Sequence, residues 1–426
     1  MKATGMPLNK VGIPSMVIGA ILIFAYIGLL PLYFGWDEYR FYGEGIQNPL
    51  LVLESFIYTC ISIVMILSGL IFTVLLLNVR VMPCIDQDYR DITQKEKFML
   101  LFLLVFCFVV LVLYLYAVPK VAIWTLITDG VFAAAAARST MANDFSGSYH
   151  WYSLVMHDLL NVITFIFYAS FLKGPTKKIK LLFAISFLGS IFTSVMAIHK
   201  APLIWLLIGM FFTYCLSKLK GQIPVKDIIK ISIVMVSILV LFYIKFMGTD
   251  NIFIALKALF SRAFTGGIAP SYYYLEYFPE VHDFLYGRSF PNPGGIFPFE
   301  PFALTVEVNN WKFPFLVGKG IVGSAPTIFW AEAYANFNYY GVFIISFLVG
   351  VLLSFVSHFV NKLENSPIKI GFTVWLILHY FHLSESGISG YLFDIYFVGI
   401  AFFVLLTLTL SNNLKLKIVK FKRSTQ

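Results

Sequence analysis

Long apolar stretches, each bounded by clusters of polar residues, recur along the whole chain. A helix needs about 20 consecutive apolar residues to cross a bilayer. We expect such helices over residues 14–34, 50–77, 98–118, 151–172, 181–198, 201–217, 228–247, 327–359, 368–386 and 391–410. No stretch carries the small-residue cleavage site of a signal peptide, so the first is expected to be an uncleaved anchor. The pattern predicts an all-α integral membrane protein of about ten transmembrane helices.

Composition agrees with a lipid-embedded chain. The 426 residues are 59% hydrophobic and only 12% charged, whereas soluble domains contain roughly 25% charged residues. Cys60, Cys107 and Cys215 fall inside predicted spans and Cys84 in a short loop, so no disulfide is expected. The net charge of +9 would suggest nucleic acid only if it formed a basic patch on a soluble face. We therefore expect membrane lipids and no nucleic acid among the partners.

The distribution of charge predicts an orientation. All but ten of the 31 Lys and Arg residues lie in one set of loops. The positive-inside rule places these loops and both termini in the cytoplasm, and so the chain in the cytoplasmic (inner) membrane. The cytoplasmic loops are short and contain no Gly-rich phosphate loop, so ATP hydrolysis is not expected. The ten cations on the opposite side are Arg40, Lys120, Arg138, Lys200, Lys245, Lys257, Arg262, Arg288, Lys312 and Lys319.

Two hydrophilic segments lie on the predicted outer side. Residues 119–150 contain two apolar runs, 122–127 and 131–137, that are too short to span and suit interfacial helices. Residues 249–326 form the one large extracytoplasmic (periplasmic) loop. The predicted organisation is thus residues 1–248 with helices one to seven, the loop 249–326, and residues 327–426 with helices eight to ten and a basic cytoplasmic tail.

Ionisable residues within the predicted spans gather in their outer halves. Such groups cost roughly 2.5–3.5 kcal/mol each in lipid, so they usually face a bundle interior or a wet cavity. Their depth suits a reaction on a lipid-linked substrate at the outer leaflet better than a transport path, which would place its site near the midplane. His358 alone lies at an inner end. The outer residues are Glu54, His157, Asp158, His199, Lys200, Lys245, Glu332, His379, His382, Glu385 and Asp394.

Three of these residues, His379, His382 and Glu385, recur at the spacing of one helix face. They can line a cavity, form hydrogen bonds between helices or take part in catalysis. Three ligands on a single helix rarely surround a metal ion, so we expect no metal site there.

The most informative stretch is SRAFTGGIAPSYYYLEYFPEVHDFLYGRSF at residues 261–290. Its aromatic rings can stack on sugar rings, with Tyr272, Tyr273, Tyr274 and Tyr277 as candidate glycan contacts. The guanidinium groups of Arg262 and Arg288 match the oxygens of a pyrophosphate. The alternative is an aromatic belt that anchors the segment at lipid headgroups.

This stretch and the following GSAPTIFWAEAYANFNYYG at residues 323–341 resemble the Wzy-type O-antigen polymerases, the oligosaccharide repeat unit polymerases. The local resemblance covers residues 262–341, and the topology extends it to the whole chain. Asn338 stands where members often have Gly after the Asn-Phe pair, and we expect Gly341 to supply that turn.

The resemblance implies a GT-C-like membrane glycosyltransferase without a cofactor or metal. Its donor and acceptor would be undecaprenyl-diphosphate-linked oligosaccharides, polymerised on the outer face into lipopolysaccharide O-antigen or a related surface polysaccharide. A flippase and a chain-length regulator would be its protein partners. For the cations that hold the diphosphate, the candidates are Arg262, Arg288, Lys200 and Arg138, and for the catalytic base Glu332, Glu276 and His382.

Three other functions fit parts of the sequence. An O-antigen ligase would use the same donor but deliver the glycan to a different acceptor. A flippase or transporter would move lipid-linked sugar without making a bond, and it would need a polar path through both leaflets. A membrane acyltransferase would need a catalytic His beside an acyl-donor tunnel, and no such motif is clear.

Overall fold

The computed structural model describes residues 10–77, 81, 88–142, 145, 147–247, 251–318, 323–392 and 394–411. These residues form helices, turns and one isolated β-bridge between Lys10 and Gln222. The elements in chain order are α1 (Ile13–Ala20), η1 (Ile21–Tyr26), α2 (Ile27–Tyr33), η2 (Tyr39–Gly43), α3 (Pro49–Leu77), α4 (Gln94–Ala117), α5 (Ala122–Asp129), α6 (Val131–Ala142), α7 (Tyr149–Ser153), η3 (Leu154–Leu159), α8 (Leu160–Lys173), α9 (Lys177–Val195), α10 (Lys200–Lys218), α11 (Val225–Met247), α12 (Ile252–Phe260), η4 (Ser261–Thr265), α13 (Gly266–Tyr277), η5 (Pro293–Gly295), α14 (Leu304–Lys312), α15 (Pro314–Val317), α16 (Phe329–Lys362), α17 (Pro367–Phe381), η6 (His382–Ser384), η7 (Ile388–Gly390) and α18 (Ile395–Leu410).

Within the described residues, nine helical stretches are long and apolar enough to cross a membrane. They run over Ile13–Tyr33, Pro49–Leu76, Gln94–Ala117, Tyr149–Lys173, Lys177–Val195, Ala201–Lys218, Ile252–Tyr277, Phe329–Lys362 and Ile388–Leu410. The expectation of an all-α, multi-span membrane protein is confirmed at this level. Eight of the nine coincide with spans expected from the sequence.

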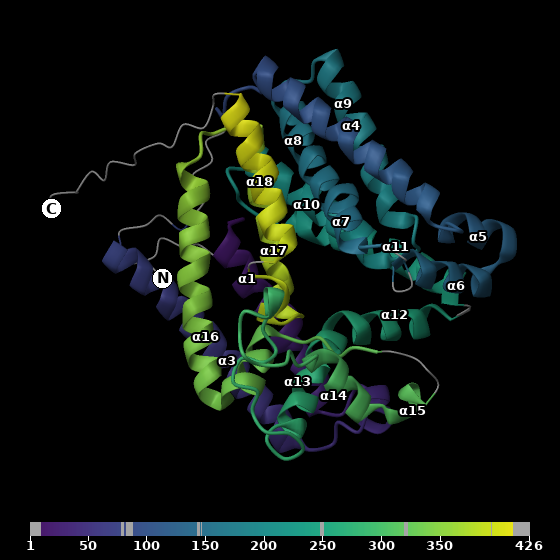
Figure 1. Cartoon of the computed structure of the whole chain (residues 1–426), viewed down its shortest axis with the longest axis vertical. Helices are drawn as coiled ribbons and strands as arrows, with labels where there is room; N and C mark the ends of the chain where they lie inside the picture. Colours follow the sequence, from purple (N-terminus) through teal and green to yellow (C-terminus); the bar gives the residue numbers. More distant parts are fainter. Residues whose placement is uncertain are drawn as a thin grey trace.

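One expected span and one loop differ from the prediction. The expected span 228–247 is helical as α11, whose 23 residues are long enough to cross a bilayer, although it is not among the nine stretches above. α17 has only 15 residues, about 22 Å at 1.5 Å per residue, which is short of a bilayer core of roughly 30 Å. The predicted outer loop instead begins with a continuous helical stretch, Ile252–Tyr277, which is one of the nine. In Figure 1, the α12 part of this stretch runs across the direction of α16 and α18.

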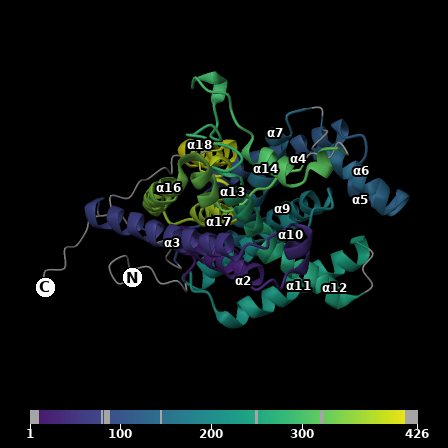
Figure 2. The same cartoon turned by 90° about the horizontal axis from the view of Figure 1, so that it is seen from below.

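The longest packed pair in the bundle is α3 against α16, which lie side by side in Figures 1 and 2. A Cβ at Gly69 would collide with the carbonyl oxygen of Phe347, and a Cβ at Gly350 would collide with that of Ile66. Glycine at both positions lets the two backbones approach closely, as small residues do in membrane helix pairs. On the other side, α17 packs against α8 and α10.

One end of the bundle collects residues from several basic loops, and we call it the basic end. Arg90 pairs with Glu96 and with Glu364, and its backbone N–H donates to the carbonyl of Asn365. Lys173 donates to the carbonyl of Tyr89. Loops expected on one side of the membrane from charge alone therefore meet in space.

The opposite, aromatic end is built by η4, α13, α14 and α15 together with residues 278–303 and 323–328. Figure 1 shows α13, α14 and α15 gathered below the bundle. Residues 278–303 have little regular structure beyond the short turn η5, as expected from their Pro and Gly content. The two short helices expected within residues 119–150 are present as α5 and α6, and Phe132 on α6 is 95% exposed.

The turn expected at Gly341 lies elsewhere. α16 contains a kink at Phe337 and Asn338, where Asn338 has a φ of 57°. Position 338 is where the resemblance led us to expect Gly, and Asn adopts positive φ more readily than most other residues. Gly341 has a different role, because a Cβ there would collide with the carbonyl of Ala333.

Candidate functional site

Two adjoining cavities lie between α11 and the rest of the bundle. The first, which we call the polar cavity, has a volume of about 740 Å³. Its lining comes from elements far apart in sequence: Phe24, Leu126, Val131, Ala134, Arg138, Ile198, His199, Ala201, Pro202, Ile204, Trp205, Ile208, Met235, Leu239, Leu259, Arg262, Ala263, Phe381 and Glu385. Two arginines, one histidine and one carboxylate are thus set into an otherwise apolar wall.

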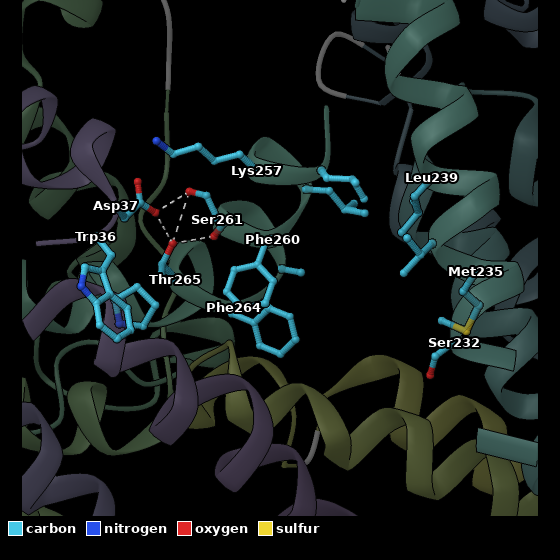
Figure 3. Close-up of a pocket in the computed structure, with 15 residues that line it drawn as sticks. Trp36, Asp37, Ser232, Met235, Leu239, Lys257, Phe260, Ser261, Phe264 and Thr265 are labelled. Carbon is cyan, nitrogen blue, oxygen red and sulfur yellow. Dashed lines mark hydrogen bonds between the residues drawn. The ribbon is translucent and has the colours of Figure 1, made fainter. Parts of the chain in front are cut away.

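The second, which we call the apolar cavity, has a volume of about 750 Å³ and lies between α11 and the α12–η4 stretch (Figure 3). Several of its polar atoms are hydrogen-bonded to one another at one edge, where the Asp37 carboxylate accepts hydrogen bonds of 2.6 Å from both Ser261 Oγ and Thr265 Oγ1. Phe260 and Phe264 face Leu239 across the gap (Figure 3). Lys257, which pairs with Glu38 at 3.6 Å, and Ser232 also line it, and the rest of its wall is mostly hydrocarbon.

The two cavities share four lining residues, Met235, Leu239, Leu259 and Ala263. The short π-helical turn η4 separates them and presents different side chains to each. Arg262 lines the polar cavity, whereas Ser261 and Thr265 line the apolar one. Together they form one amphipathic space, with positive charge in one half and hydrocarbon in the other.

The expected diphosphate cations divide into three groups. Arg262 and Arg138 both line the polar cavity, although they come from η4 and α6. Lys200 begins α10 between two lining residues, His199 and Ala201, but its side chain lies outside the described residues. Arg288 does not line the cavity, because its guanidinium lies over the ring of Phe302, 5.9 Å from the ring centre.

The three residues expected as catalytic bases lie in different places. His382 Nδ1 lies 2.8 Å from Glu385 Oε1, and the His382 ring packs edge-on against Trp205. Glu385 and Trp205 both line the polar cavity, so this pair belongs to the site. Glu276 lies elsewhere and forms a 2.6 Å ion pair with Lys312. It is therefore neutralised by a structural partner.

Glu332 does not line either cavity. It is 4% exposed and accepts hydrogen bonds from Ser289 Oγ and the Ser389 N–H. A carboxylate enclosed in this way has no access to a substrate hydroxyl in the cavity, so the expectation that it is the base receives no support from its position.

The four tyrosines expected to hold glycan are core residues. Tyr272, Tyr273 and Tyr274 are each 2% exposed or less, and Tyr277 is also buried. Tyr272 accepts a hydrogen bond from the Asn48 N–H, while the hydroxyls of Tyr273 and Tyr274 donate to Glu44 and to the Ala325 carbonyl. Their ring faces are covered by protein, so they are not open to stack on a sugar.

The expectation that His379, His382 and Glu385 share a helix face is wrong, because α17 ends at Phe381 and His382 begins a tighter turn. His379 instead lies 3.4 Å from Asp394, within the bundle. Among the described residues, no three His, Cys, Asp or Glu side chains are grouped so that they could hold a metal ion.

The sequence predicts His199 and Glu385 as outer ionisable residues, and Glu385 as one that can line a cavity, but neither is among the expected diphosphate cations or bases. Burial and, next, the charge of Arg138 lower the pKa of His199 below its ordinary value. The imidazole is therefore neutral at pH 7. The sequence signals for both residues were weak: His199 adjoins Lys200, and Glu385 follows His382 by three positions.

The fold and the cavities define a class: an all-α, multi-span membrane protein with a cationic, amphipathic cavity open between its helices. No family model, no curated protein and no solved structure matches the chain.

Proposed function

We propose that this chain is a GT-C-like glycosyltransferase that polymerises undecaprenyl-diphosphate-linked oligosaccharide repeat units on the outer face of the cytoplasmic membrane. One observation carries the proposal. Arg138, Arg262 and Glu385, from three distant segments, line a single cavity that continues into an apolar one. This combination matches an amphiphile with an anionic headgroup and a long hydrocarbon chain.

The arginines suit the leaving group. In the transfer, an acceptor hydroxyl oxygen attacks the anomeric carbon of the donor glycan, and the bond from that carbon to the diphosphate oxygen breaks. The bonding electrons leave with undecaprenyl diphosphate, whose developing charge needs preorganised cations. Arg138 and Arg262 supply them in a cavity with mostly apolar walls, where charge interactions are stronger than in water. The isoprenoid chain of the lipid then lies in the apolar cavity beside Phe260 and Phe264.

The base is the Glu385 carboxylate, which takes the proton of the attacking hydroxyl. Its other oxygen is held by His382 Nδ1 at 2.8 Å. This contact orients the carboxylate toward the cavity that Glu385 lines. Two arginines in the same cavity balance the negative charge that the reaction develops.

The proposal also specifies the side of the membrane on which the protein acts and the proteins with which it works. The aromatic end, which reaches both cavities through η4, is the periplasmic face, because the basic loops at the other end obey the positive-inside rule as cytoplasmic loops. The protein takes its lipid-linked units from a flippase, and a chain-length regulator works beside it.

The test is polymerisation by the purified protein in liposomes, with the lipid-linked repeat unit as sole substrate. We expect a ladder of longer glycans and release of undecaprenyl diphosphate. Arg262→Ala should slow the reaction by about 100- to 1000-fold, as removal of one preorganised oxyanion partner does. Arg288→Ala is the matched control, since Arg288 lies outside the cavity.

Two results would count against the proposal. Product that forms only after a different acceptor is added would indicate a ligase, and lipid movement without new glycosidic bonds would indicate a flippase. Equal activity of Arg262→Ala and the wild type would remove the cavity from the reaction.

A further inference from the structure

Glu332 is a buried carboxylate that joins two separate segments to the start of α16. Its Oε1 accepts a 2.7 Å hydrogen bond from Ser289 Oγ, which belongs to the irregular part of the aromatic end. Its Oε2 accepts a 3.0 Å hydrogen bond from the backbone N–H of Ser389, in the turn that follows α17. Because the carboxylate is enclosed, both hydrogen bonds form away from solvent and hold their partners firmly.

The first segment is attached to α16 at several further points. Asn336, one helical turn after Glu332, donates to Ser289 Oγ at 2.7 Å and accepts from the Gly287 N–H at 2.9 Å. The carbonyls of Ala335 and Asn336 accept the N–H groups of Leu285 and Tyr286. These carbonyls are free to do so because the helix is interrupted at Phe337 and Asn338.

The second segment, residues 382–390, carries the His382–Glu385 pair. Gly387 in this turn packs directly on the carboxylate, and a Cβ there would collide with Glu332 Oε2. On its other side the turn meets α13, where a Cβ at Gly267 would lie 3.4 Å from Glu385 Cβ. Glu385 is thus held between α13 and a turn that is anchored on Glu332.

We propose that Glu332 is a positioning residue, which acts through this turn to fix Glu385 and His382 toward the polar cavity and takes no proton itself. The proposal rests on the function proposed above for the pair. The Ser289 hydrogen bond holds the other oxygen of the same carboxylate, so Glu332 is fixed from both sides.

Two substitutions separate positioning from proton transfer. Glu332→Gln keeps an oxygen that can accept from the Ser389 N–H and an amide that can donate to Ser289 Oγ, so it should retain activity within roughly threefold. Glu332→Ala removes both hydrogen bonds and should lower turnover by about 100-fold, the usual effect of misplacing a reacting group by an ångström. If Glu332→Gln is as inactive as Glu332→Ala, the carboxylate itself is needed and the proposal is wrong.

A double-substitution series tests whether the effect passes through Glu385. In a Glu385→Ala background, Glu332→Ala should cause little further loss, because the group that it positions is already absent. Full additivity of the two losses would overturn the proposal. Glu276→Ala is the matched control, since Glu276 is a partly buried carboxylate of the same end that pairs with Lys312 rather than with the turn.

A labelling experiment detects a change in the position of the turn at residues 382–390 without measuring glycosyl transfer. With the four native cysteines replaced, Glu385→Cys introduces a single thiol into the cavity wall. Its rate of reaction with a small maleimide should change several-fold when Glu332→Ala is added and should stay the same with Glu332→Gln. An unchanged rate with Glu332→Ala would refute the positioning role, whereas a changed rate with no polymer from any variant would refute the proposed function alone.

Discussion

Replacing Arg90 by Met should destabilise the basic end of the bundle. Arg90 Nη2 lies 2.5 Å from Glu96 Oε1 and its Nη1 2.7 Å from Glu96 Oε2, so the carboxylate is held by both. Its Nε lies 2.9 Å from Glu364 Oε2. The Glu96 side chain is fully buried, whereas that of Arg90 is 22% exposed. Arg90→Met keeps much of the packing but, among the described residues, leaves the Glu96 carboxylate with its hydrogen bond from the Thr93 N–H and no cation.

Removing one partner of a buried ion pair costs about 3–5 kcal/mol, because the other charge stays buried. Since water reaches part of the Arg90 site, we expect a smaller loss of about 2 kcal/mol in the free energy of unfolding. The measurement is unfolding in mixed micelles of sodium dodecyl sulfate and dodecyl maltoside, followed by tryptophan fluorescence. Adding Glu96→Gln to Arg90→Met should recover most of the loss, because the buried charge is then gone.

The matched control is Lys120→Met, which breaks the 3.3 Å pair of Lys120 and Asp129. Their side chains are 65% and 44% exposed, and such surface pairs contribute little. A loss for Arg90→Met no larger than for Lys120→Met would refute the view that the basic end is held by a buried carboxylate. So would a double substitution less stable than Arg90→Met alone.

Three shorter predictions concern packing, protonation and ligand entry. Gly350→Ala should lower the thermal unfolding temperature measured by fluorescence, since α3 leaves no room for a Cβ, while Gly19→Ala, with open space around it, should not. Folding lowers the pKa of His199 below its ordinary 6.5, so the unfolded chain binds more protons than the folded chain as the pH falls through 6.5. The free energy of unfolding should therefore decrease on acidification, and it should decrease less steeply in His199→Gln or Arg138→Gln. Leu239→Trp should fill the wall shared by both cavities and weaken binding of undecaprenyl diphosphate, measured by the quenching of protein fluorescence.

Most of the membrane architecture could be predicted because lipid imposes a strong requirement on sequence. Every backbone polar group in hydrocarbon must be paired within its own helix, so a span needs a long apolar stretch. Eight such stretches were placed correctly. α11 also forms a helix where a span was expected, so α17 alone departs from the prediction. For α17, the helix ends early where the turn of His382 begins.

The candidate site could be predicted only in part. Arg138, Arg262 and His382 stand out as charged or titratable residues near expected span ends, and the structure brings them to one cavity or to its edge. The tyrosines and Glu332 stand out for the same reasons, yet the structure buries them away from both cavities. Residue type reveals that a group is polar or aromatic, but its burial and partners depend on contacts between segments far apart in the sequence.

The side chains of η4 show most clearly what the sequence alone does not predict about the site. In a regular α-helix, side chains follow a period of 3.6 residues, and a sequence can be read for the face that each occupies. Residues Ser261–Thr265 form a π-helical turn, in which the extra residue shifts every following side chain around the axis. Within this turn Ser261 and Thr265 bind Asp37 beside the apolar cavity (Figure 3), whereas Arg262 lines the polar cavity, and the sequence alone predicts neither the turn nor the two cavities.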